Sequence, residues 1–397
     1  MPNGLTAASM RAPERLAETH ATTPVASAAR IVEIDVLRVL AIAAILVCHL
    51  PEYLLGVPGL PSLWASRPYA GILGLGLFTF VSGYAIDVSQ ARRDYRQSAA
   101  EFAKRRILRI FPLYVPAVLC FVVLFHGLGV WHHWTFAPLA PTIGIQLVGA
   151  QVLLSPWYRP ILTLWFVGAI LIYYALYFAL TRLTKRMTLL AAYGAAAFLL
   201  GAVARSAIGA LGIQFFLYWF PFLAGVLCHR VRLAAQTRFR LNLTAAAMAA
   251  LVAAAAGIGA AAWKVRLFVE ADSPALSLPG ILPSLVLANV FMLSATLVAW
   301  WFARAIVARM PPRVGTALWY VAALSYPIYL FHRPCLATVA AAMEQLGVRW
   351  PIGQNLGVFC VGLLLVLLLA ALLHRCERLL SGLVTRDRRQ LAQSLQP

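Results

Sequence analysis

Apolar runs of about 20 residues recur along the whole chain, and they limit its possible folds more than any other feature. A helix needs about 20 such residues to cross a hydrocarbon core of ~30 Å. Only 12% of the 397 residues are charged, whereas a soluble domain carries about a quarter. We place spans near residues 33–55, 70–89, 107–127, 163–181, 188–206, 213–230, 242–263, 281–303, 316–339 and 355–376. The sequence therefore predicts an all-α, polytopic integral membrane protein with ten transmembrane helices.

The basic residues predict the orientation of these spans. The chain has 33 Lys and Arg residues and a net charge of +20. If the N-terminus is cytoplasmic, few of them fall in outer loops: Arg67, Arg159, Arg205, Lys264, Arg266 and Arg349. Cytoplasmic loops are enriched in Lys and Arg, so we expect both termini in the cytoplasm and the protein in the cell inner membrane. Because the basic clusters alternate with spans rather than form one patch, we expect no nucleic-acid partner.

The short connections leave room for one membrane domain, over residues 31–378. Residues 1–30 lack the apolar core of a signal peptide, and we expect a disordered cytoplasmic tail there. Residues 379–397 form a basic cytoplasmic tail. The longest outer loop, 128–162, contains an apolar stretch at 143–154 that is too short to span. It is expected either to lie flat on the surface or to dip into the membrane and return.

No metal site is expected. The six cysteines lie in or beside apolar runs without CxxC spacing, which is typical of small packing residues. His126, His132 and His133 have no acidic residue or cysteine nearby, so a metal cluster is not indicated.

The first span carries ionisable residues, which are costly in a bilayer and therefore functional candidates. Asp35 and Arg38 lie near its cytoplasmic end, and His49 follows Arg38 by eleven residues. Eleven helical steps bring Arg38 and His49 to one face, ~16 Å apart along the axis. A neutral imidazole can act as a general base. The alternative is a histidine that is only hydrogen-bonded inside the bundle.

The second span ends in a small-residue break, Ser82-Gly83-Tyr84, followed by Asp87. The break is equally typical of a ligand contact and of a packing seam for a neighbouring helix. We expect Asp87 to pair with an arginine on the cytoplasmic side.

The third span begins with Arg105, Arg106 and Arg109. Arg105 and Arg109 are four residues apart and share a helix face, with Arg106 beside them. Such a cluster suits phosphate oxygens. Orientation charge and anionic lipid headgroups are the alternative explanation.

The ninth span places Ser325, Tyr329 and His332 on one face, at spacings of four and three residues. His332 lies about as deep from the cytoplasmic end as His49. The residues therefore form either part of a reaction site or a structural hydrogen-bond cluster.

Together these stretches resemble the membrane acyltransferases of the acyltransferase type 3 family, which O-acylate bacterial surface polysaccharides and lipid-linked sugars. The matching stretches occur in order: Asp35-Val36-Leu37-Arg38 with His49; Gly76 to Ile86; Arg105 to Arg109 with Pro112-Leu113-Tyr114; and Ser325 to Leu330 with His332. Leu164-Trp165-Phe166 is a weaker fifth match.

The resemblance implies an acyl-coenzyme A donor, with acetyl-coenzyme A expected, and a glycan or glycolipid acceptor beside membrane lipid. It implies that His49 and Arg38 are catalytic, His49 as general base or as a transiently acylated nucleophile. The expected donor-binding residues are Asp35, Arg105, Arg106, Arg109, Ser82, Gly83 and Tyr84, and the expected acceptor-side residues are His332, Tyr329, Ser325 and Trp165.

A transporter or flippase for a glycolipid or amphipathic substrate is the competing hypothesis. Proton-coupled carriers usually have carboxylates within the membrane. Here the acidic residues near spans, such as Glu52 and Asp87, lie at span ends. A purely structural or sensing role does not explain four stretches that carry chemistry.

Overall fold

The computed structural model describes residues 31–53, 60–130, 139–155, 157–235, 243–262, 278–348 and 351–394. Within these ranges the chain is helical and contains no strand. The expected tail at 1–30 lies outside the described residues. The last helix continues to Ser394, so most of the segment expected as a C-terminal tail is helical.

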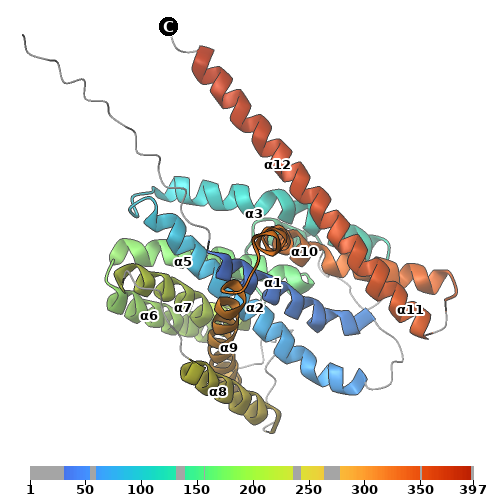
Figure 1. The fold of residues 1–397 in the computed structure, drawn as a ribbon, viewed down its shortest axis with the longest axis horizontal. Helices are drawn as coiled ribbons and strands as arrows, with labels where there is room; N and C mark the ends of the chain where they lie inside the picture. The colour runs from blue at the N-terminus through green and yellow to red at the C-terminus, as the bar shows by residue number, and fades with distance from the viewer. Residues whose placement is uncertain are drawn as a thin grey trace, which may run out of the picture. The chain divides into compact units, whose positions relative to one another are not determined.

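Each of the ten expected spans falls on a helix (Figure 1). The helices are α1 (Val32–His49), α2 (Leu60–Ala91), α3 (Ala99–Phe121), α4 (Leu139–Leu147), α5 (Trp165–Leu183), α6 (Met187–Ile208), α7 (Ile213–Ala235), α8 (Leu243–Ala262), α9 (Leu278–Val307), α10 (Pro312–Gln345), α11 (Pro351–Gly357) and α12 (Leu363–Ser394). The short 3₁₀ helices are η1 (Leu50–Tyr53) and η3 (Leu162–Leu164), and the π-helical segments are η2 (Val122–Gly127) and η4 (Val358–Gly362).

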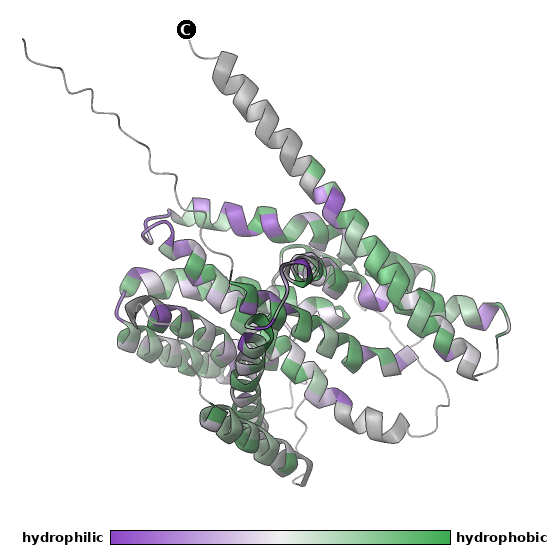
Figure 2. Cartoon of the chain, viewed as in Figure 1, coloured by the Kyte–Doolittle hydropathy of each residue, from purple (hydrophilic) through white to green (hydrophobic). Residues whose placement is uncertain are grey.

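Seven helices of the described residues are long and apolar enough to cross a membrane. They include α2, α3, α5, α6, α9, α10 and the segment Asn355–Glu377. Figure 2 shows hydrophobic colour along these helices and hydrophilic colour at the connection between α2 and α3. The chain is therefore a multi-pass membrane protein by length and composition. That α1, α7 and α8 also span, and that both ends are cytoplasmic, remain predictions.

Glycines bring α2 into close contact with α1 and α7. A Cβ added to Gly83 would lie 2.0 Å from the carbonyl oxygen of Phe222, and one added to Gly225 would lie 2.0 Å from that of Phe80. A Cβ on Gly74 would lie 2.9 Å from the carbonyl oxygen of Ala41 on α1. Small residues that admit such close backbone approach are a common means of packing membrane helices. Gly83 thus belongs to a packing seam between α2 and α7.

Basic connections that are distant in sequence meet at one end of the bundle. Arg182, at the end of α5, donates to the carbonyl of Gln97 in the α2–α3 connection. Arg230, on α7, donates to the carbonyl of Lys185 after α5 at 3.1 Å. These contacts bring three of the expected cytoplasmic segments to the same side, as the alternation of basic loops requires.

Asp87 is fully buried at this end of the bundle. Its carboxylate accepts from Arg230 Nε at 3.2 Å and from Tyr177 Oη at 2.8 Å, so the expected pairing with an arginine is confirmed. His229 Nδ1 lies 2.7 Å from it. Tyr95, in the α2–α3 connection, also donates to Asp87 at 3.1 Å. Burial and the neighbouring Asp87 carboxylate raise the pKa of Tyr95 above its ordinary value, so its hydroxyl remains a hydrogen-bond donor.

The segment after α4 inserts into the bundle. Gln151 is fully buried, and its Nε2 donates to Tyr114 Oη at 2.9 Å and to the carbonyl of Leu164 at 3.0 Å. Tyr114 itself donates to the carbonyl of Gln146 at 2.9 Å. Irregular backbone is tolerated inside a membrane protein when protein groups satisfy it. Of the two expectations for the 143–154 stretch, a dip into the membrane and return agrees with these buried contacts, whereas a position flat on the surface does not.

Candidate active site

Two cavities meet at Tyr329 on α10. The larger has a volume of about 500 Å³ and is lined by residues of α1, α2, α3, α5, α10 and α12. The smaller has a volume of about 60 Å³ and is lined by residues of α1, α2, α10 and the 160–165 segment. Tyr329 lines both, so its side chain lies at the boundary between them.

Arginines line the larger cavity. Arg38 comes from α1, and Arg106 and Arg109 come from α3. Arg38 Nη1 lies 3.5 Å from Oδ1 of Asp35, which is buried. Neither Arg106 nor Arg109 forms an ion pair with an acidic residue in the described ranges, and Arg106 Nε is buried there without a hydrogen-bond partner. The cavity therefore offers guanidinium groups with free capacity for an anion.

Ring faces support the Arg106 guanidinium. Its carbon lies 5.7 Å from the centre of the Tyr174 ring and 5.9 Å from that of Phe102. Cation–π contact holds a guanidinium in place without neutralising it. Among the described residues that line this cavity, the acidic one is Glu377 on α12, and it forms no ion pair with Arg106 or Arg109.

The structure separates Arg105 from its neighbours. Arg106 and Arg109 are three residues apart and share the face toward the cavity, whereas the exposed Arg105 is absent from its lining. The shared face of α3 thus runs through 106 and 109 rather than through 105 and 109. That Arg105 contacts the donor remains a prediction, because Arg105 does not line this cavity.

Ser82 lines the larger cavity, but Gly83 and Tyr84 do not. Ser325, which was expected on the acceptor side, also lines the larger cavity rather than the smaller one. The Tyr84 ring lies 5.1 Å from that of His229 and 5.8 Å from that of Trp300, which places it against α7 and α9. Gly83 and Tyr84 therefore occupy the packing side of α2. Their predicted role in donor binding gains no support from this position.

His49 lines the smaller cavity together with Trp165 and Arg333. The other lining residues are Ile45, Gly71, Leu75, Pro160, Leu162, Thr163 and Tyr329. His49 is buried, with 7% of its surface exposed, and faces this cavity rather than the outside of the bundle. Its imidazole is thus available to a small group held there.

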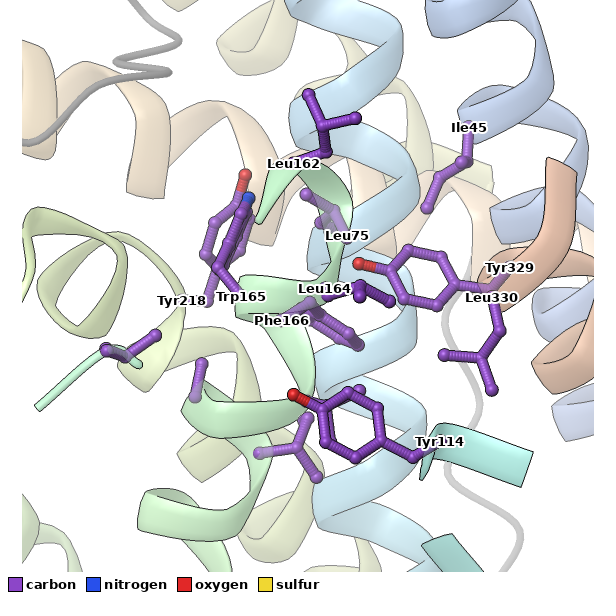
Figure 3. Close-up of a cluster of buried hydrophobic side chains, with 14 of the residues drawn as sticks. Ile45, Leu75, Tyr114, Leu162, Leu164, Trp165, Phe166, Tyr218, Tyr329 and Leu330 are labelled. Atoms are coloured by element: carbon purple, nitrogen blue, oxygen red, sulfur yellow. The ribbon is translucent and has the colours of Figure 1, made fainter. Parts of the chain in front are cut away.

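Aromatic side chains separate the two cavities. The Tyr329 ring lies 5.4 Å from Phe166 and 6.1 Å from Phe78, which lie 6.4 Å from each other. Figure 3 shows Tyr329 beside Phe166, with Leu75 and Ile45 on the neighbouring helices. Tyr329 Oη donates to the carbonyl of Thr163. These three rings therefore pack together in the part of the larger cavity that reaches Tyr329.

The two histidines that the sequence places at similar depth are in contact. The centres of the His49 and His332 rings lie 5.2 Å apart. His332 Nδ1 lies 2.7 Å from the carbonyl oxygen of Tyr329, which can only accept, so this nitrogen carries the proton. His332 is fully buried and lies behind His49 rather than in the cavity lining.

Sequence reasoning missed Glu52 and Arg67. Glu52 Oε1 lies 3.0 Å from His49 Nδ1, and the same carboxylate accepts from Arg67 and Arg333. The sequence signal that could have indicated Glu52 is its position three residues after the candidate base His49, just beyond the end of α1. Its partners lie 15 and 281 residues away in the sequence, so spacing could not reveal them.

A family model described as an acyltransferase domain matches residues 31–375. The chain belongs to the acyltransferase 3 family. The match includes the residues that line the two cavities except Glu377, and nearly the whole of the expected membrane domain at 31–378. Neither a curated protein nor a solved structure matches the chain.

Proposed function

We propose that this acyltransferase moves an acyl group, normally acetyl, from cytoplasmic acyl-coenzyme A to a hydroxyl of a surface polysaccharide or lipid-linked sugar. Transfer takes place at the outer face of the inner membrane, with both termini cytoplasmic. The observation that carries the proposal is the meeting of an arginine-lined cavity with a histidine-lined cavity at Tyr329. A donor with phosphates at one end and a thioester at the other matches this order of groups.

The larger cavity supports the donor assignment. Arg38, Arg106 and Arg109 would hold the phosphates, because guanidinium groups bind phosphate oxygens in a bidentate manner. The pantetheine arm would extend along α1 toward His49, which lies ~16 Å from Arg38 along an ideal helix. Ser82 and Ser325 line the larger cavity, and their hydroxyl groups would form hydrogen bonds with the amides of that arm.

The smaller cavity supports the chemistry. His49 Nε2 would take the proton of the acceptor hydroxyl while its oxygen attacks the thioester carbonyl carbon. A carbon–oxygen bond forms, the carbon–sulfur bond breaks, and the proton passes from His49 to the leaving thiolate. The products are an ester and free coenzyme A. Arg333 lines the same cavity and could donate to the developing oxyanion. Transient acylation of His49 is the second route within this proposal.

Cavity size supports acetyl as the acyl group. A water-sized sphere needs about 10–15 Å³, so the smaller cavity, at about 60 Å³, holds roughly four to six such spheres. An acetyl group has three heavy atoms, and the attacking oxygen adds a fourth. Leu75 and Ile45 close the apolar side of this space.

Enlarging the cavity should broaden the range of donors. Leu75→Ala removes three carbons from the lining, so we expect the rate with butyryl-coenzyme A relative to acetyl-coenzyme A to rise roughly tenfold or more, as for added methylenes in other pockets. Leu285→Ala on α9 is the matched control, because Leu285 is buried outside the cavity lining and carries a similar packing cost. An unchanged donor ratio in the Leu75 variant would exclude this cavity as the acyl site.

The proposed function is tested with membranes that contain or lack the protein. Radiolabelled acetyl-coenzyme A is added, and label is counted in extracted glycolipid and polysaccharide. We expect ester-linked label only when the protein is present. If no glycan gains label with any of several acyl donors, transport of a glycolipid or amphipathic substrate becomes the better explanation.

A further inference from the structure

We propose that Glu52 is a positioning residue that holds the His49 ring in the orientation and tautomer needed for proton abstraction. The inference rests on the proposed function, because it assigns Glu52 a role through His49. It concerns a side chain that neither the sequence motifs nor the family match singles out. The ring, the carboxylate and two guanidinium groups form a partly buried cluster at the end of α1.

Hydrogen-bond chemistry fixes the tautomer. Glu52 contacts the guanidinium groups of Arg67 and Arg333, which favour its ionised form. An ionised carboxylate can only accept, so His49 Nδ1, at 3.0 Å, must carry a proton. In a neutral imidazole the other nitrogen then presents a lone pair. Nε2 of His49 has no hydrogen-bond partner among the described residues, and the side chain lines the smaller cavity.

The carboxylate is itself held from two sides. Oε1 accepts from Arg67 on α2, and Oε2 accepts from Arg333 on α10. Arg67 Nε also donates to the carbonyl of Cys48 at 2.8 Å. One guanidinium therefore binds both the carboxylate and the backbone immediately before His49. The orientation of Glu52 is set by three helices rather than by its own turn.

The local chain path explains why the acid can reach the ring. α1 ends at His49, and η1 (Leu50–Tyr53) turns the chain directly after it. Glu52 is three residues on and folds back toward the imidazole. On the other side, the His332 ring lies 5.2 Å from the His49 ring. The imidazole thus has a carboxylate at one nitrogen and a second imidazole ring nearby, and its side chain lines the smaller cavity.

A carboxylate in this place also stabilises the imidazolium that forms when the base accepts a proton. Carboxylates that orient histidines in this way contribute to rate rather than to substrate binding. Because the arginines of the larger cavity are separate from this cluster, loss of Glu52 should lower kcat and leave the KM for the donor nearly unchanged.

The test compares Glu52→Gln with Glu52→Asp in purified full-length protein. We expect Glu52→Gln to lower kcat by about 10²-fold or more, with little change in the KM for acetyl-coenzyme A. Glu52→Asp keeps the charge on a shorter arm and should recover a large part of that loss. Glu344→Gln, an exposed glutamate on α10, is the matched control for the chemical change. Equal loss in the Gln and Asp variants would overturn the proposal.

A second variant separates positioning from charge balance. Glu52→Gln leaves two guanidinium groups without their carboxylate, which alone could disturb the fold. The double variant Arg67→Gln/Glu52→Gln removes one of those charges. Positioning predicts that the double variant stays as slow as Glu52→Gln, while Arg67→Gln alone keeps far more activity. Recovery of activity in the double variant would show that Glu52 only compensates charge.

The outcomes also separate this inference from the proposed function. If His49→Ala is inactive and Glu52→Gln is fully active, only the positioning role fails. If the wild-type protein transfers no acyl group from any donor, the proposed function itself fails.

Discussion

His49→Ala is expected to lose acyl transfer, with a drop of about 10²- to 10⁴-fold, the contribution typical of a general base. The reason is that, among the described residues that line the smaller cavity, His49 carries the nitrogen that can accept a proton, whereas the buried Arg333 is a permanent cation. The measurement is label transfer from acetyl-coenzyme A per mole of purified protein. Size-exclusion elution shows whether the variant remains folded.

His126→Ala provides the control for a histidine replacement. His126 is exposed on η2, directly after α3, and lies outside both cavity linings. Transfer by His49→Ala at the wild-type rate would remove the base from the mechanism, whichever route the acyl group takes.

Arg109→Ala and Arg106→Ala are expected to raise the KM for acetyl-coenzyme A by roughly 10- to 100-fold each, the range for loss of a charge-assisted hydrogen bond. Arg38→Ala should act in the same direction. The KM for the acceptor should change much less, because the acceptor enters at the other cavity. Initial rates measured against each substrate in turn give both constants.

Arg105→Ala makes this test specific to the structure. Arg105 is adjacent to Arg106 but is exposed outside the cavity, so its replacement should cost much less donor affinity. If all three α3 variants were equally impaired, general attraction of the anionic donor would replace direct binding. Equal effects on donor and acceptor would count against a donor role as well.

The long apolar runs made the helices predictable. Each run predicted a helix where one is found, since a span of this length in lipid must satisfy its backbone internally. The runs could not show that Gly83 and Gly225 join α2 to α7, because the two residues are far apart in sequence. α1 and α7 also carry charged residues that make them poor spans by composition alone, although they pack in the centre of the described bundle.

Part of the candidate site was predictable because helical periodicity fixes which residues share a face. The periodicity of α1 placed Arg38 and His49 on one face, and each now lines one of the two cavities that meet at Tyr329. The same rule grouped Arg105 with Arg109 on α3, whereas the structure turns Arg106 and Arg109 toward the cavity, where α3 packs against α5 and α10. The Glu52 cluster was not predictable, since a turn and three helices assemble it.

The most direct test is a structure of the full-length protein with a non-transferable acetyl-coenzyme A analogue. The account predicts the phosphates against Arg38, Arg106 and Arg109, the arm past Tyr329, and the acyl carbonyl carbon within a few ångströms of the oxygen site beside His49 Nε2, near the ~3–3.5 Å needed for attack. An analogue bound elsewhere, or a His49 ring turned toward lipid with the analogue in place, would contradict it.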